Sequence, residues 1–137
     1  MKQIWSVIQV AFAALGGVFG WFMGGLDGFL YALIAFVAVD YITGVLSAIE
    51  RGTLSSTVGF KGIARKVLIF TLVGIGNIID TTILKSGTAI RTAVIFFYLS
   101  NEGISILENT AHLGLPIPKV LKNVLETLNK EDEDEFK

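Results

Sequence analysis

The chain has 137 residues, enough for one domain, and it contains no cysteine, which excludes disulfide scaffolds and thiolate metal sites. Hydrophobic residues make up 53% of it and charged residues 17%, against about 25% charged residues in an average soluble domain, which argues against a soluble globular fold. With a net charge of −1 and no basic stripe outside the apolar segments, nucleic acid is not expected as a partner.

Four segments have the length and composition of transmembrane helices, which need about 20 mostly apolar residues. They cover residues 4–23, 29–49, 67–84 and 92–107, and the last is the weakest because polar residues fall inside it. The sequence therefore predicts an all-α membrane protein with three to four transmembrane helices and leaves that choice open. The membrane domain is expected to cover residues 1–115.

The connections between these segments predict the orientation of the chain. The segment from Glu50 to Lys66 is a long, basic loop, whereas the turn from Gly24 to Gly28 contains no base. Because cytoplasmic loops carry an excess of lysine and arginine, this loop is expected in the cytoplasm, and the N-terminus with it. The basic residues of the loop are Arg51, Lys61, Arg65 and Lys66.

The C-terminal part changes character at Pro116 and Pro118, which discourage a continuing helix. Apolar residues then recur at helical spacing, which predicts a cytoplasmic amphipathic helix over residues 116–130. Such a helix lies on the membrane surface or pairs with a copy of itself. The acidic tail, residues 131–137, is expected to be disordered.

Glycine recurs at four-residue spacing in the first span, which places the glycines along one face of a helix. Helices in lipid associate through close backbone packing, so this face, and a glycine of the second span, are expected to contact other helices. The alternative is that glycine is common in membrane helices and that the last glycines of the row belong to a turn. The expected helix-packing residues are Gly16, Gly20, Gly24 and Gly44.

Five polar residues fall inside the predicted spans, where an ionised aspartate costs about 2.5–3.5 kcal/mol. They are expected to line an aqueous interior once several copies assemble. Alternatively, Asp40 is a hydrogen-bonded packing residue, and Asn77 and Asp80 mark the end of a helix. Pairing of Asp80 with Arg91 across a short turn would lower the cost of both. The five residues are Asp40, Asn77, Asp80, Asn101 and Glu102.

No group of residues predicts catalysis. No serine stands in a recognisable nucleophile motif, and no glycine-rich phosphate loop occurs. The single histidine, His112, is expected to be a surface or capping residue. We therefore expect a protein that is not an enzyme and that needs neither a cofactor nor a metal.

Two blocks of residues resemble the toxin-secretion/phage-lysis holin family. The first joins an aspartate and a Thr-Gly pair to a Ser-Ser-x-x-Gly-x-x-Gly-x-x-x-Lys segment, here Asp40, Thr43, Gly44, Ser55, Ser56, Gly59, Gly62 and Lys66. The second comprises Asn101, Glu102, Ser105, Glu108, Asn109, Pro116 and Pro118. The similarity covers about residues 27–128.

This resemblance implies a protein of the bacterial (host) cytoplasmic membrane without enzymatic activity. Such proteins accumulate as homo-oligomers and then open timed holes. The holes collapse the membrane potential and let an endolysin, or in some relatives a protein toxin, leave the cell. The implied partners are the lipid bilayer, further copies of the chain and the endolysin or toxin as passenger.

Two other functions fit the same sequence. A small ion channel or transporter subunit would use the same intramembrane charges to pass one small solute. A non-pore membrane partner, such as an anti-holin, would recruit another protein through residues 119–130 and would not kill cells by itself.

Overall fold

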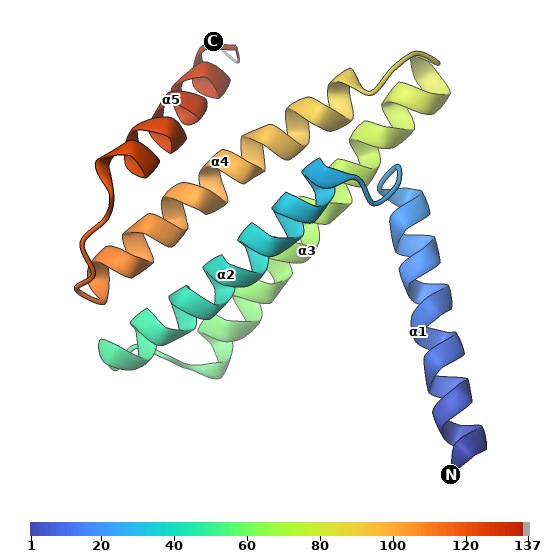
Figure 1. Ribbon diagram of the computed structural model, residues 1–137, viewed down its shortest axis with the longest axis horizontal. Coiled ribbons are helices and arrows are strands. Elements are labelled where there is room, and N and C mark those ends of the chain that lie inside the picture. Colours follow the sequence, from blue (N-terminus) through green and yellow to red (C-terminus); the bar gives the residue numbers. More distant parts are fainter. Residues whose placement is uncertain (136–137) are drawn as a thin grey trace.

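The computed structural model describes residues 1–135, and it consists of helices joined by short connections (Figure 1). No strand occurs in these residues, so the predicted all-α class is confirmed. The elements in chain order are α1 (Lys2–Phe22), α2 (Gly28–Glu50), α3 (Ser56–Ile78), the short π-helix η1 (Ile79–Ile83), α4 (Ala89–His112) and α5 (Lys119–Glu135).

Four helical segments are long and apolar enough to cross a membrane, and their bounds are Lys2–Phe22, Gly28–Glu50, Ser56–Ile83 and Ala89–His112. The third runs through η1 without a break. The described chain therefore has four candidate spans, including the fourth one, which its polar residues had made the weakest prediction.

The helices α2, α3 and α4 lie side by side, with α3 antiparallel to the other two (Figure 1). The first helix, α1, diverges from this three-helix bundle and approaches it near its own C-terminal end, where the rings of Phe19 and Phe70 lie 5.7 Å apart in an edge-to-face contact. Only 6% of the apolar stretch of α1 is buried, against 22–28% for the other three spans. Most of α1 is therefore without a partner in a single subunit.

The third span begins earlier than predicted, and the prediction of a long basic loop over residues 50–66 is wrong. Ser55 caps α3, since its hydroxyl accepts a hydrogen bond from the Val58 backbone N–H at 3.2 Å. Of the four basic residues assigned to that loop, Arg51 lies in the short connection, whereas Lys61, Arg65 and Lys66 belong to α3. Lysine and arginine lowered the apparent hydropathy of a segment that is in fact helical.

The C-terminal helix also differs from its predicted bounds. It begins at Lys119 and continues to Glu135, whereas the sequence predicted disorder from residue 131. Glutamate, which occupies three of the five added positions 131–135, is a good helix former and favours the longer helix. Residues 136 and 137 lie outside the described residues. Instead of standing apart, α5 runs back along α4 (Figure 1).

The core of the bundle is apolar and lies nearer the α1–α2 turn than the opposite end. Glycine allows close contact beside it: a Cβ atom at Gly74 of α3 would coincide with the ring of Phe22 at the end of α1. The buried core residues are Met23, Leu30, Leu33, Val37, Ile69, Val73 and Ile95.

Candidate functional site

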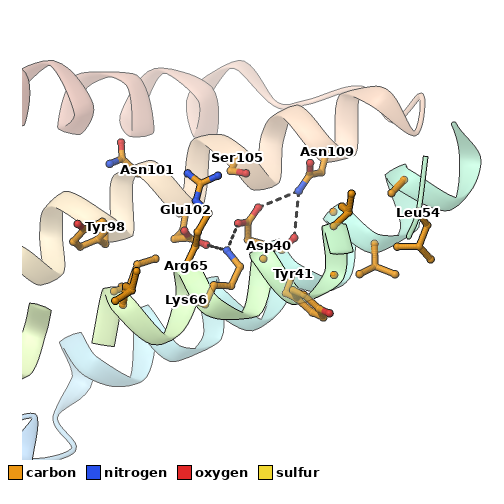
Figure 2. A pocket seen from close by; sticks show the side chains of 18 of the residues that line it. Asp40, Tyr41, Leu54, Arg65, Lys66, Tyr98, Asn101, Glu102, Ser105 and Asn109 are labelled. Carbon is orange, nitrogen blue, oxygen red and sulfur yellow. Dashed lines mark hydrogen bonds and ion pairs between the residues drawn. The ribbon is translucent and has the colours of Figure 1, made fainter. Parts of the chain in front are cut away.

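The centre of the candidate site is a lysine that two carboxylates share. The Lys66 ammonium of α3 lies 2.6 Å from Asp40 Oδ2 of α2 and 2.7 Å from Glu102 Oε2 of α4 (Figure 2). Asp40 is 7% exposed and Glu102 8% exposed, so these groups are buried inside the bundle. One side chain on each of three helices therefore contributes to a single charge network.

Asn109 of α4 extends the network along α2. Its Nδ2 donates hydrogen bonds to Asp40 Oδ1 at 3.0 Å and to Thr43 Oγ1 at 3.1 Å. Gly44 adjoins this contact, since a Cβ built there would lie 3.5 Å from Asn109 Nδ2, an ordinary packing distance. Asp40 thus accepts hydrogen bonds from both α3 and α4, as a hydrogen-bonded packing residue would.

The network opens into a groove of about 630 Å³ between α2, α3 and α4 (Figure 2). Tyr41 forms part of its wall and packs against Gly62, where a Cβ would lie 3.4 Å from the tyrosine ring. The charged, amide and hydroxyl side chains that line the groove, apart from tyrosine, are Asp40, Arg65, Lys66, Asn101, Glu102, Ser105 and Asn109.

The network lies near the middle of the candidate spans, which is the least polar depth when such helices cross a membrane. Asp40 is near the middle of α2 (Gly28–Glu50), and Glu102 is near the middle of α4 (Ala89–His112). An unpaired charge at that depth costs several kcal/mol, and pairing with hydrogen bonds offsets much of it. The contacts to Lys66 and Asn109 therefore explain how two carboxylates can lie within apolar helices.

A second polar cluster joins the opposite end of the bundle. The Arg91 guanidinium at the start of α4 donates to Asp27 Oδ2 at 2.7 Å, to the Gly25 carbonyl at 2.9 Å and to the Met23 carbonyl. Arg91 is 2% exposed and holds the turn between α1 and α2 against α4. The hydrogen bond from Arg91 lowers the pKa of Asp27 below its ordinary value.

This arrangement corrects the predicted pairing of Arg91 with Asp80. The side chain of Asp80 instead accepts hydrogen bonds from the backbone N–H groups of Ile90 at 3.0 Å and Arg91 at 2.8 Å, so it caps the start of α4. Asn77 donates to the Phe22 carbonyl at 3.1 Å. These contacts favour the alternative in which Asn77 and Asp80 mark the end of a helix.

The predicted intramembrane polar residues therefore divide into two groups. Asp40, Asn101 and Glu102 line the groove, whereas Asn77 and Asp80 lie at the other end of the bundle. Four of the five have partners within one subunit, so their burial does not require further copies of the chain. That these residues line an aqueous lumen in an assembly stays a prediction.

The glycines of the first span that were predicted to pack helices together also fall into two groups, one in a turn and one within α1. Gly24 belongs to the turn after α1 rather than to a helix, with a φ of +89°, and it lets the turn approach Asn77 and Arg91 closely. Gly16 has nothing within 4 Å of a built Cβ, and Gly20 has only Leu26, at 3.8 Å. No residue of another helix lies within 4 Å of a Cβ built at either glycine, and the role of Gly16 and Gly20 in packing between subunits stays a prediction.

Among the described residues, no group of three or more histidine, cysteine or acidic side chains is placed to hold a metal ion. Sequence reasoning missed Lys66 as the centre of the network and assigned it to a loop. It named Asn109 only as part of the family resemblance and missed its contact with Asp40, and it also missed the pairing of Asp27 with Arg91. No local pattern marks these contacts, because the partners are separated by between 26 and 69 positions in the chain.

The family profile and a named relative that match this chain point to the same protein family. The profile of the bacteriophage holin family matches residues 17–130. An uncharacterised protein of Listeria innocua is 43% identical over 129 residues, covering 94% of this chain and 91% of the relative. A 14.9 kDa protein of Clostridium perfringens is 41% identical over 130 residues, which cover 94% of this chain and 98% of the relative. A protein of Bacillus phage phi105 named "Probable holin" is 34% identical over 105 residues, 77% of each chain. No solved structure matches the chain.

Proposed function

Since this chain belongs to the bacteriophage holin family, we propose that it homo-oligomerises in the bacterial cytoplasmic membrane and opens timed holes. The holes dissipate the membrane potential and release an endolysin, or a protein toxin, from the cytoplasm. The observation that carries this proposal is the Lys66 network, which pairs membrane-embedded charges across three helices of one subunit.

The network supports quiet accumulation before the holes open. A holin has to collect in a sealed membrane, and each subunit must therefore keep its charges compatible with lipid. Lys66 satisfies Asp40 and Glu102 within the subunit, and Asn109 satisfies the second oxygen of Asp40. A single copy can then remain in the bilayer without a water-filled path.

The same network supports a later transition. Two carboxylates and one ammonium carry a net charge of −1 when all are ionised, and this excess charge is more stable beside water than within lipid. An assembly that lets water reach the groove between α2, α3 and α4 relieves that cost. We propose that the falling membrane potential assists this step, since one charge crossing the field is worth about 2.3 kcal/mol per 100 mV.

The distribution of basic residues supports a cytoplasmic N-terminus. Arg51 and Lys61 lie near the connection between α2 and α3. Since α1 and α2 are both candidate spans, the N-terminus falls on the same side of the membrane as this connection. Because lysine and arginine accumulate on the cytoplasmic side of membrane proteins, that side is assigned to the cytoplasm. The turn containing Asp27 then lies on the outer side.

The proposal is tested by expressing the chain in bacteria that also make a cytoplasmic endolysin without an export signal. Abrupt lysis that requires both proteins is the expected result, with a loss of membrane potential at the same moment. Loss of potential without release of the folded endolysin would point to a small ion channel. Growth that continues undisturbed at a confirmed membrane level would point to an anti-holin or another non-pore partner.

A further inference from the structure

The C-terminal helix α5 binds the bundle through a specific socket. Leu125 of α5 is 6% exposed, and it packs against Gly103 near the middle of α4. A Cβ built at Gly103 would lie 2.8 Å from Leu125 Cδ2 and 3.2 Å from Phe36 Cε2 of α2. Leu125 therefore fits this position only because residue 103 has no side chain.

The position of this socket conflicts with a lipid environment. Gly103 lies in a helix long and apolar enough to span the membrane, so α5 docked beside it lies at the depth of the hydrocarbon core. The outer side of α5 is charged: Lys122 and Glu126 are 4.0 Å apart, and their side chains are 59% and 49% exposed. Charged side chains at that depth are strongly disfavoured against lipid and favoured against water.

The apolar contact leads to the same conclusion. In lipid, helices gain little by burying apolar surface against each other, because acyl chains are as apolar as leucine. In water, the same contact covers the apolar surface around Phe36 and Gly103, and the hydrophobic effect favours it. Docking of α5 is therefore favourable only where this face of the bundle meets water.

The connection between α4 and α5 permits a change of position. Gly114 has a φ of +87° and nothing within 4 Å of a built Cβ, and Pro116 and Pro118 interrupt helix formation after it. Away from α4, the amphipathic helix can lie on the cytoplasmic membrane surface. Among the side chains that the structure describes, none from α5 lines the groove, so docked α5 leaves the groove open.

We propose that α5 is a mobile lining helix of the hole. In the sealed membrane it lies on the cytoplasmic surface, and in the open hole Leu125 docks against Gly103 so that the polar side of α5 faces the lumen. This inference rests on the proposed function, and it assigns one water-facing surface of the assembly to α2, α4 and α5.

The test uses thiol cross-linking, for which the chain is suited because it has no native cysteine. In the variant Gly103→Cys/Leu125→Cys, the leucine methyl groups that a Cβ at 103 would meet are removed, so docking remains possible. The control is Gly103→Cys/Asn123→Cys, since Asn123 is exposed on α5. Cells expressing each variant with the endolysin are oxidised briefly before and after the abrupt loss of membrane potential.

The expected result is little 103–125 cross-link in sealed membranes and a several-fold increase after opening, with no such increase in the control. A complete cross-link in sealed membranes overturns the inference, whereas normal lysis of those cells would leave the proposed function standing. Normal lysis without a cross-link at either stage also overturns it. A chain that cross-links but never opens the membrane overturns both proposals.

A second variant addresses the docked state directly. Gly103→Leu fills the socket and should reduce endolysin release several-fold at equal membrane level. The matched control is Ala93→Leu, at an exposed position of the same helix. Equal release by the two variants contradicts a role for docked α5 in the open hole.

Discussion

Replacing Lys66 with methionine removes the cation that Asp40 and Glu102 share, and it should make the holes open earlier. Lys66 Nζ lies within 2.7 Å of an oxygen of each carboxylate. Methionine keeps an unbranched side chain of similar length and a high helix propensity, so α3 and its packing are retained. The change therefore acts mainly on the charge balance of the network.

The size of the effect follows from the burial of the three side chains. Lys66 is 17% exposed, and the carboxylate side chains of Asp40 and Glu102 are 9% and 10% exposed, so little water offsets the loss. Removing one partner of a buried ion pair costs about 3–5 kcal/mol, because a buried charge is left uncompensated. Each loss of about 1.36 kcal/mol lowers the ratio of sealed to water-exposed subunits about tenfold. That ratio therefore falls by about 10²- to 10⁴-fold.

The assay measures the time from induction to abrupt lysis in cells that also contain the endolysin. Immunoblots of isolated membranes keep the comparison at matched protein levels. Lys61→Met is the control, because Lys61 is an exposed lysine of the same helix without an ion pair to the described residues. The triple variant Asp40→Asn/Lys66→Met/Glu102→Gln should return lysis toward the wild-type time, since it removes the uncompensated charges as well. Equal lysis times for Lys66→Met and Lys61→Met would refute the reasoning.

The remaining predictions concern three other positions. Asp40→Asn should shift the time of lysis because it changes the charge balance of the network, and an identical time at matched expression would remove this residue from the trigger. Gly20→Leu should weaken self-association measured by chemical cross-linking in membranes, with Ala11→Leu as control, since Ala11 is exposed on the opposite face of α1; oligomers unchanged in the Gly20 variant would contradict a packing role for α1. The hydrogen bond from Arg91 lowers the pKa of Asp27, so the stability that this carboxylate contributes is complete above its ordinary pKa of 3.8 and is lost as the pH falls through the lower folded value. Thermal unfolding in detergent from about pH 6 to about pH 3 should therefore show a larger loss of stability for wild type than for Asp27→Asn. Parallel stability profiles of the two proteins across this pH range would contradict a stabilising contact between Asp27 and Arg91.

The helical character of the chain and its first three spans were predictable because apolar length is a property of neighbouring residues, whereas the choice between three and four spans was left open. The bounds of α2 and α4 extend the predicted spans 29–49 and 92–107 by one to five residues at each end. The start of α3 was not predictable in the same way. Lys66 belongs in an apolar helix only because Asp40 and Glu102 lie beside it, and those partners are 26 and 36 positions away.

The sequence was sufficient to identify the two carboxylates of the candidate site, but not the contacts that they make. Asp40 and Glu102 were recognisable as polar residues inside spans, and they do lie together. Their partner was assigned to a loop, and the burial of their charges was attributed to many subunits rather than to one. The contact at Gly103 was beyond sequence reasoning as well, because it depends on α5 folding back along α4.

The sharing of one lysine by residues of three helices also constrains how this chain can evolve. A neutral replacement at position 66 is compatible with the sealed membrane only if positions 40 and 102 lose their charges too. Drift at these three positions should therefore be correlated among descendants of a common ancestor. Lineages would be found in two forms, one with the complete charged triad and one with an uncharged set, and mixed forms would be rare.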